Sequence, residues 1–420
     1  MTTTSATAPD IPADPQTPPA RLRRLFRWII PTTVSVHIIW GAVAALLLPL
    51  QVQQLDPAAK VSNLAIISAI GATVAMVAQP IAGTISDRTR SRFGRRAPWM
   101  VGGALCGGLA LVGMSFANTL LPLVIAWVIV QISYNFAQGP LSAVMPDRVP
   151  RARRGTFSAL MGVGVMLGAL GGQVVGAALS SNIPRAYLIL SGLAITMLTL
   201  FVVFNPDRSS RDDVHPPFRL KDFLNTFWVS PRRHPDFFWA FLGRLLLYTG
   251  YFAVTGYQLY ILQDFVGLGS GAVALVPVAG IISVACMIIA TAVSGPISDR
   301  LQRRKVFIII ASVVMGVAFL IPVALPSVTG WIIFSALSGL GFGVFQAVDT
   351  AVMSEVLPSV DSFAKDLGVV NIAATLPQAV APALAGAVVA GLGGYIALFP
   401  VGLVLAVAGA LAILPIRAVR

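Results

Sequence analysis

The chain of 420 residues is 56% hydrophobic and only 11% charged, and its mean hydropathy is +0.84. Soluble globular proteins carry about 25% charged residues, so the composition excludes an ordinary soluble domain and predicts a polytopic membrane protein. The formal net charge of +13 would suit nucleic acid, but the placement of the basic residues, described below, argues against that partner. The two cysteines, Cys106 and Cys286, lie inside apolar stretches, so we expect no disulfide framework and no metal site.

The first segment, residues 1–27, is predicted to be a disordered cytoplasmic tail, since it is proline-rich and lacks the features of a signal peptide. Twelve apolar stretches follow, each long enough to cross a bilayer as a helix. The predicted spans are 28–50, 61–83, 97–117, 120–144, 155–180, 184–204, 237–262, 270–295, 305–325, 329–354, 365–390 and 394–416.

These spans form two sets of six, separated by a polar segment. We therefore predict an all-α membrane protein with a six-helix bundle over 28–204, a cytoplasmic linker over 205–236, a second six-helix bundle over 237–416 and a cytoplasmic tail over 417–420.

The basic residues fall almost entirely in alternate loops. Of the 29 Lys and Arg residues, all but Lys60, Arg185 and Arg244 lie in the tails, the linker and the loops on the side of the N-terminus. Because short cytoplasmic loops carry the excess of Lys and Arg, both termini are predicted to be cytoplasmic. The same distribution explains the positive net charge without nucleic acid.

Two short motifs recur in the two halves. The stretch GTISDR (Gly83–Arg88) returns as GPISDR (Gly295–Arg300), and each copy closes the second predicted helix of its half. MPD (Met145–Asp147) and MSE (Met353–Glu355) close the fourth in the same way. Two parallel six-helix repeats are typical of transporters that bind a solute between their halves, near the membrane midplane.

In GTISDRTRSRFGRR (Gly83–Arg96), GPISDRLQRRK and PDRVPRARRG (Pro146–Gly155), the chain resembles the major facilitator superfamily of secondary transporters. The resemblance runs from about Arg27 to Arg417. Within the family, SDRTRSRFGRRAPW is similar to the glycoside–pentoside–hexuronide cation symporters and the sucrose-transporter-like branch. The sodium-coupled members carry acids in the second helix, and the absence of any before Asp87 weighs against sodium coupling.

The arginine-rich loop after the second predicted helix contains an aspartate, Asp87, that a topology signal alone does not need. Gly83 would let two helices approach closely. Asp87 could accept hydrogen bonds from nearby arginines or meet a helix N-terminus; the resemblance implies the start of the eleventh helix when the inner gate is closed. A solvated turn is the alternative, but the aspartate recurs at Asp299. The predicted conformational latch comprises Gly83, Asp87, Arg88, Arg95, Asp147, Arg154, Asp299 and Arg300.

Polar and aromatic side chains recur at helical spacing on the first, fourth, seventh and tenth predicted spans, and the resemblance implies that these helices line a solute cavity. Single amides can also join membrane helices, but four stripes favour a cavity. Aromatic rings beside amides suit sugars, and they equally suit an amphipathic drug. The predicted substrate-binding residues are His37, Trp40, Gln131, Asn135, Gln138, Tyr248, Tyr251, Gln258, Gln346, Asn371 and Gln378.

Two charged residues, Arg244 and Asp349, lie inside the seventh and tenth predicted spans at similar depth. Each alone is costly in a membrane, so we expect them to form an ion pair. The pair is either permanently structural or opens when Asp349 takes a proton. His37, which titrates near neutrality when unperturbed, is the rival proton site, unless it is a neutral histidine bonded to a neighbouring helix.

These features predict a secondary active transporter of a small organic solute in the cell membrane, with protons as coupling ion and no cofactor. Sugar or glycoside symport is favoured over a proton-antiport exporter of drugs or secondary metabolites. The exporter alternative rests on GVMLGALGG (Gly164–Gly172), which resembles an antiporter motif but has Ala169 where proline is usual. No HExxH, GxSxG or Walker loop indicates an enzyme. We expect a monomer in the lipid bilayer.

Overall fold

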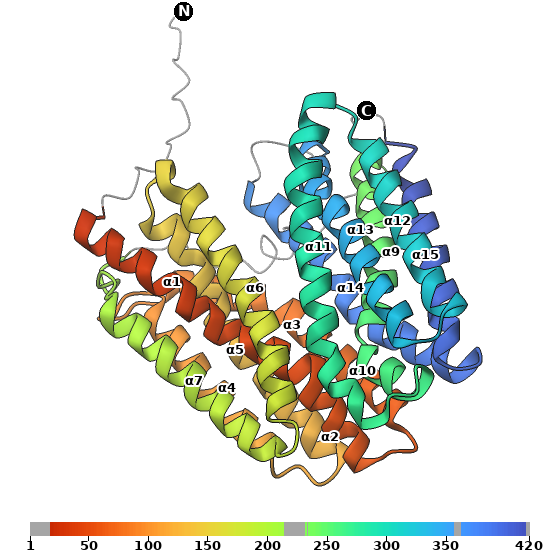
Figure 1. Cartoon of the computed structure of the whole chain (residues 1–420). Helices are drawn as coiled ribbons and strands as arrows, with labels where there is room; N and C mark the ends of the chain where they lie inside the picture. The colour runs from red at the N-terminus through yellow and green to blue at the C-terminus, as the bar shows by residue number, and fades with distance from the viewer. Residues whose placement is uncertain (1–16, 214–231, 233, 357–362, 417–420) are drawn as a thin grey trace, which may run out of the picture.

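The computed structural model describes residues 17–213, 232, 234–356 and 363–416, without the side chains at 350, 354, 355, 363–371, 373 and 374. Within these ranges the chain consists of helices and short connections and contains no strand. The helices of the N-terminal half pack with one another, and so do those of the C-terminal half (Figure 1).

The N-terminal bundle holds seven labelled helices. They are α1 (Pro19–Ile39), α2 (Leu48–Leu55), α3 (Lys60–Arg88), α4 (Ala97–Met114), α5 (Leu120–Arg148), α6 (Arg154–Ala178) and α7 (Ile183–Phe204).

The C-terminal bundle follows residue 234. Its helices are α9 (Pro235–Thr255), α10 (Gln258–Tyr260), α11 (Ala272–Leu301), α12 (Arg304–Ala324), α13 (Val328–Glu355), α14 (Phe363–Gly391) and α15 (Leu398–Ile413).

Eleven helical stretches of the described residues are long and apolar enough to cross a membrane, so the chain is a multi-pass membrane protein. The eleventh predicted span corresponds to α14, whose described apolar part is Thr375–Gly391. The count of twelve spans and the side on which the termini lie stay predictions. Both copies of the repeated motif close their helices as expected, at the ends of α3 and α11.

The first span differs from its prediction in two ways. Helix α1 already begins at Pro19, inside the segment expected to be a tail, because Leu22 and Leu25 pack into the core. Its continuation Trp40–Leu47 is a π-helix that leads into α2. Pro49 follows at once and cannot donate a backbone hydrogen bond, which is the kind of residue that disturbs a regular α-helix.

Glycines on α6 explain how α1 and α6 come close. A Cβ added at Gly164, Gly168 or Gly172 would lie within 2.7 Å of an atom of α1 or η1 (Trp40–Leu47). Only glycine, which has no Cβ, fits such a contact. The stretch that resembles an antiporter motif is thus accounted for by helix packing within one bundle.

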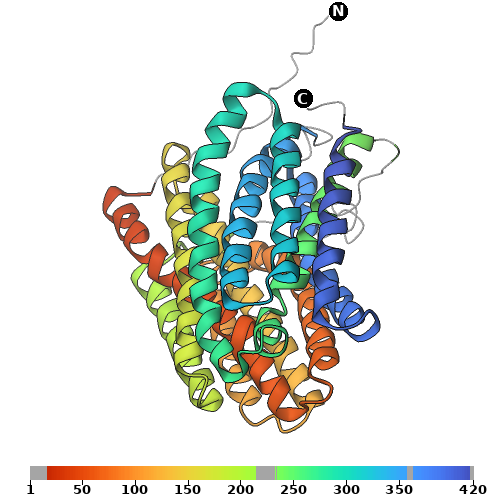
Figure 2. The same cartoon turned by 45° about the vertical axis from the view of Figure 1, so that its right-hand side comes forward.

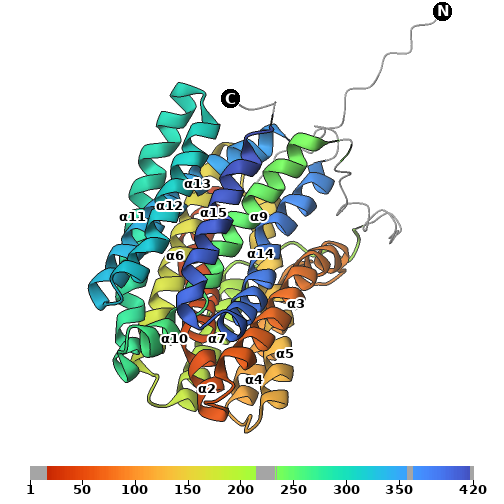
Figure 3. The same cartoon turned by 90° about the vertical axis from the view of Figure 1, so that its right-hand side faces the viewer.

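The two bundles touch through α3 with α14 and through α6 with α11. Figure 3 shows α3 beside α14. We name the two ends of the molecule by α3, which is 29 residues long and spans about 43 Å. The arginine end holds Arg88, where α3 ends, and the opposite end holds Lys60, where it begins. The bundles diverge toward the arginine end, where α1 begins and α15 ends (Figures 1 and 2).

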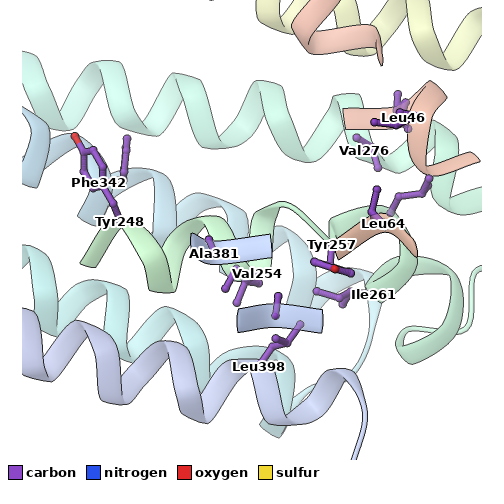
Figure 4. Packing of buried hydrophobic residues seen from close by; sticks show 14 of the residues in the cluster. Leu46, Leu64, Tyr248, Val254, Tyr257, Ile261, Val276, Phe342, Ala381 and Leu398 are labelled. Carbon is purple, nitrogen blue, oxygen red and sulfur yellow. The ribbon is translucent and has the colours of Figure 1, made fainter. Parts of the chain in front are cut away.

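The larger apolar core crosses the boundary between the bundles near the opposite end. Leu46 and Leu64 of the N-terminal bundle belong to the same buried cluster as Tyr257, Ile261 and Val276 of the C-terminal bundle (Figure 4). A second, smaller cluster lies wholly in the N-terminal bundle and includes Leu25 and Phe157. Apolar burial therefore joins the bundles at one end.

Candidate functional site

The candidate substrate residues of the N-terminal bundle centre on Trp40. Its indole Nε1 donates to Gln138 Oε1 at 3.4 Å. Its ring makes edge contacts with Trp127 and Tyr134, at centroid distances of 6.1 and 6.3 Å. The structure therefore joins predicted residues of the first and fourth spans, and it adds two aromatic residues that the sequence did not single out.

Gln131 and Asn135 lie deeper inside the same bundle. Asn135 Nδ2 donates to Gln131 O of its own helix at 2.8 Å, and both side chains are buried. A Cβ added at Gly71 of α3 would come within 3.2 Å of Gln131 Nε2, so this amide faces α3. The three polar residues of α5 therefore have different surroundings: Gln138 accepts a hydrogen bond from Trp40, Gln131 faces α3, and Asn135 bonds to its own helix.

Three aromatic rings in contact form the C-terminal counterpart. Tyr251 stacks on Phe342 with a centroid distance of 4.3 Å and an interplanar angle of 19°. Tyr248 lies 5.1 Å from the same ring. Tyr248 is buried, and Tyr251 is half-buried. The seventh and tenth predicted spans, here α9 and α13, therefore meet through rings that offer both apolar faces and phenol hydroxyls.

The expected ion pair is present directly beside these rings. Arg244 Nη1 lies 3.3 Å from Asp349 Oδ2, and the two side chains are 10% and 5% exposed. The Arg244 guanidinium also lies 5.2 Å from the ring centroid of Tyr248. Because the pair joins α9 to α13 inside the apolar part of the bundle, breaking it would leave a charge without a partner.

His37 is half-buried between α1 and α6. Its Nδ1 lies 2.9 Å from Thr33 O of its own helix. This contact suits a neutral ring that donates from Nδ1 and leaves Nε2 as an acceptor.

The remaining substrate candidates are spread along the C-terminal bundle. The seventh span is not one continuous helix: α9 ends at Thr255, and Gln258 starts the short α10 beyond Tyr257. Gln346 and Gln378 are exposed on α13 and α14. Asn371 lies on α14, but its side chain is outside the described residues.

The repeated motif builds a charge network whose centre is Arg96. This side chain is 6% exposed and pairs with Asp87 Oδ1 at 2.5 Å and with Asp147 Oδ2 at 2.8 Å. It also donates to Ser86 Oγ at 3.1 Å. Arg95 completes the group by pairing with Asp147 Oδ1 at 2.6 Å. The loop between α3 and α4 thus places Arg95 and Arg96 against the carboxylates at the ends of α3 and α5.

Four expectations for the latch need comment. Arg154, expected in this network, donates instead to the backbone carbonyls of Val149 and Pro146. Among the described residues, a Cβ added at Gly83 meets no atom within 4 Å, while a Cβ added at Gly139 of α5 lies 3.7 Å from Gly83 N. The close helix approach expected of the Gly83 side stays a prediction. The start of α14, the expected partner of Asp87, lies outside the described side chains. In the second copy, Asp299 pairs with Arg304 at 3.7 Å.

Replacing Arg96 tests the centre of the network. We expect Arg96→Gln to lower the free energy of unfolding by about 1.5–3 kcal/mol, because Asp87 and Asp147 each lose a charge-assisted hydrogen bond to a buried arginine. Thermal unfolding of the purified protein in detergent measures the effect. Arg92→Gln, which removes an exposed charge from the same loop, is the control. Equal melting temperatures of the two variants would contradict the central place of Arg96.

The helical bundles, the repeated motif and the buried charge pair are those of a transporter, and comparisons with known proteins agree. The sequence pattern of the Major Facilitator Superfamily matches residues 29–294 and 278–420. The chain belongs to this superfamily.

Two relatives are informative. The chain is 29% identical to the sucrose transport protein SUC4 of Arabidopsis thaliana over 169 residues, which is 35% of this chain and 32% of that protein. The match thus spans about a third of the relative. The crystal structure of the nucleoside transporter NupG superposes with a TM-score of 0.74 over 93% of this chain and 99% of that one, at 13% identity. This likeness establishes the fold alone.

Proposed function

We propose that the protein is a proton-coupled symporter of an uncharged sugar or glycoside, working by alternating access. The arginine end would face the cytoplasm, because short cytoplasmic loops carry the excess of positive charge. The structure would then be the state in which the solute site opens toward the cytoplasm.

The observation that carries the proposal is that the bundles are fastened together at the opposite end. Lys60 Nζ pairs with Asp264 Oδ2 at 2.8 Å across the boundary. Tyr260 donates to Pro49 O at 2.7 Å, and Tyr257 donates to Val61 O at 3.2 Å. A transporter that alternates must break such contacts to open the other way, and single exposed ion pairs and neutral hydrogen bonds are weak enough to allow it.

An uncharged solute is supported by the candidate residues, which are paired in charge in the C-terminal bundle and neutral around Trp40 in the N-terminal bundle. Arg244 and Asp349 neutralise one another at 3.3 Å. The Trp40–Gln138 contact offers neutral donors and acceptors. A charged solute would need an uncompensated opposite charge in the membrane region, and none of the described candidate residues supplies one.

A sugar or glycoside is supported by the rings. Tyr251 and Phe342 stack between α9 and α13, and Trp40 of the first span contacts the ring of Trp127 in the N-terminal bundle. Such rings pack against the apolar faces of sugars, while amides and phenols bind hydroxyls. The partial similarity to a sucrose transport protein agrees with this class.

Uptake by proteoliposomes tests the proposal. An inward proton gradient should drive accumulation of radiolabelled sucrose or a glucoside, and a protonophore should abolish it. Uridine is the control solute, because the fold is shared with a nucleoside transporter. Efflux of solute against the gradient, or accumulation of uridine alone, would contradict the proposal.

Removing the Gln138 side chain tests the substrate site. We expect Gln138→Ala to weaken solute binding about two- to tenfold, because the loss of one neutral hydrogen bond costs about 0.5–1.5 kcal/mol. The measurement is the dissociation constant by equilibrium binding. Ser142→Ala, one turn further along α5, removes only a bond from the Ser142 hydroxyl to a backbone carbonyl and should leave binding unchanged. Equal affinities in both variants would remove Gln138 from the site.

A further inference from the structure

A cavity of about 420 Å³ lies at the arginine end of the N-terminal bundle, away from the residues proposed for solute binding. Four separate parts of the chain enclose it: the start of α1, the loop between α3 and α4, the end of α5 and the segment after α7. This volume lies in the range of small-molecule sites, about 300–1,000 Å³.

The wall after α7 is held in place by specific contacts. Ser91 N donates to Ser210 Oγ at 3.0 Å, and Ser210 Oγ donates to Thr89 O at 2.9 Å. Gly94 has a φ of +86°, and a Cβ there would lie 2.6 Å from Asp207 Cβ. Only glycine both adopts this conformation without strain and leaves room for the segment. The cavity is therefore a built feature of the fold.

Each of the four parts contributes a guanidinium to the lining. The four residues are Arg21, Arg95, Arg148 and Arg208. Three carboxylates also line the cavity, but two already have arginine partners. Asp147 is shared between Arg95 and Arg96, and Asp213 pairs with Arg208 at 3.0 Å. The third is Asp207, so four guanidinium groups face three carboxylates, and Asp147 is also shared with Arg96 outside the lining. Positive charge is therefore in excess.

Arg148 and Arg21 are the lining arginines without an ion pair in the described structure, although Asp207 attracts Arg148 from a longer distance. Arg148 is half-buried and donates to the backbone carbonyls of Asn205 at 2.9 Å and Pro206 at 3.4 Å, which are neutral acceptors. Among the described residues, neither Arg148 nor Arg21 has a carboxylate within ion-pair distance. Guanidinium groups bind phosphate oxygens through paired, charge-assisted hydrogen bonds, which are stronger than bonds to neutral carbonyls.

We propose that this cavity binds a phosphate ester. The phosphate contacts Arg21 and Arg148, and the rest of the volume takes the esterified group. Two sources offer this chemistry, an anionic lipid headgroup from the adjoining leaflet and a free phosphorylated metabolite. Either ligand would also compete with Asp147 for Arg95, so binding is coupled to the charge network around Arg96.

The test measures the melting temperature of the purified full-length protein in nanodiscs. In phosphatidylcholine nanodiscs, glycerol 3-phosphate should raise the melting temperature with dose, and glycerol should not, if the source is soluble. Replacing part of the phosphatidylcholine by phosphatidylglycerol should raise it if the source is a lipid. Either result supports the proposal, and the two arms tell the sources apart.

Variants connect the effect to the cavity. Arg21→Gln and Arg148→Gln should each lower the affinity for whichever probe stabilises the protein by about tenfold or more. This is the value of a lost hydrogen bond to a charged group. Arg23→Gln, two residues along α1 and outside the cavity lining, is the control for charge. Arg21 is exposed, so its variant keeps the fold even if Arg148→Gln does not. No stabilisation by either probe, or equal stabilisation of the Arg21→Gln and Arg23→Gln variants, would overturn the proposal.

Discussion

Asp349→Asn abolishes proton-driven accumulation of solute while counterflow without a gradient continues. This expected result follows from the buried pair of Arg244 and Asp349, 3.3 Å apart. Asp349 is the only carboxylate in the described membrane part of α9 and α13 whose protonation would release a buried arginine. Asparagine cannot exchange a proton, so the gradient no longer favours one conformation over the other. Proton uptake and counterflow, measured in the same proteoliposomes, separate the two effects.

Two further variants make the result decisive. Asn at this position leaves Arg244 without its charged partner, so a loss of fold could imitate a loss of coupling. The double variant Arg244→Gln with Asp349→Asn has no buried charge and should likewise exchange solute without accumulating it. His37→Gln should have a milder effect. Unchanged proton-driven accumulation in Asp349→Asn would remove Asp349 from coupling, and uncoupling by His37→Gln alone would place the proton site in the N-terminal bundle.

Gly83→Leu slows transport about fivefold or more while the protein stays folded. In the part of the chain that the structure describes, a Cβ added at Gly83 meets no atom within 4 Å, and the same holds for Gly295 in the repeated motif. At the opposite end, where the bundles touch, the corresponding contacts are tight: a Cβ at Gly386 would lie 2.5 Å from Ala65 Cβ. We infer that small residues mark closure at both ends, so Leu at Gly83 fits this state and clashes when the arginine end closes. Overpacking costs about 1–3 kcal/mol, enough to suppress that state about fivefold or more.

The measurement for this variant is the counterflow rate together with the melting temperature. Gly102→Leu is the matched control, since a Cβ there also meets nothing within 4 Å and the residue lies mid-helix on α4. We expect both variants to keep a normal melting temperature and only Gly83→Leu to lose counterflow. Full activity in Gly83→Leu would show that closure does not bring a helix against this position.

Several parts of the structure could be predicted because they depend on large free-energy costs of placing polar groups and charges in lipid. Long apolar stretches must become helices in lipid, so the helical fold followed from hydropathy. The pairing of Arg244 with Asp349 followed from similar depth in two spans, since each charge alone is costly. The repeated motif closed α3 and α11 as expected, because its charges cannot enter the membrane.

Other parts depend on the rotation and local shape of helices, which periodicity in an apolar sequence does not fix. Gln131 turned toward α3 and Gln138 toward Trp40, although both were assigned to one face. The break at Gly256 divided the predicted stripe of the seventh span. Arg96 became the centre of the motif network because the loop turns back at Gly94, which has a φ of +86°. In the sequence, this turn was indicated only by Gly94 itself.

Distances between spin labels at both ends test the central claim, which is alternation between two states. With the natural cysteines replaced, one pair of labels at Ala152 and Leu301 reports on the arginine end, and a second pair at Ser181 and Ser270 reports on the opposite end. All four positions are exposed. Adding the transported solute at low pH should shorten the first distance and lengthen the second in part of the molecules. Distances that stay fixed at both ends, or that change in the same direction, would contradict alternating access in this protein.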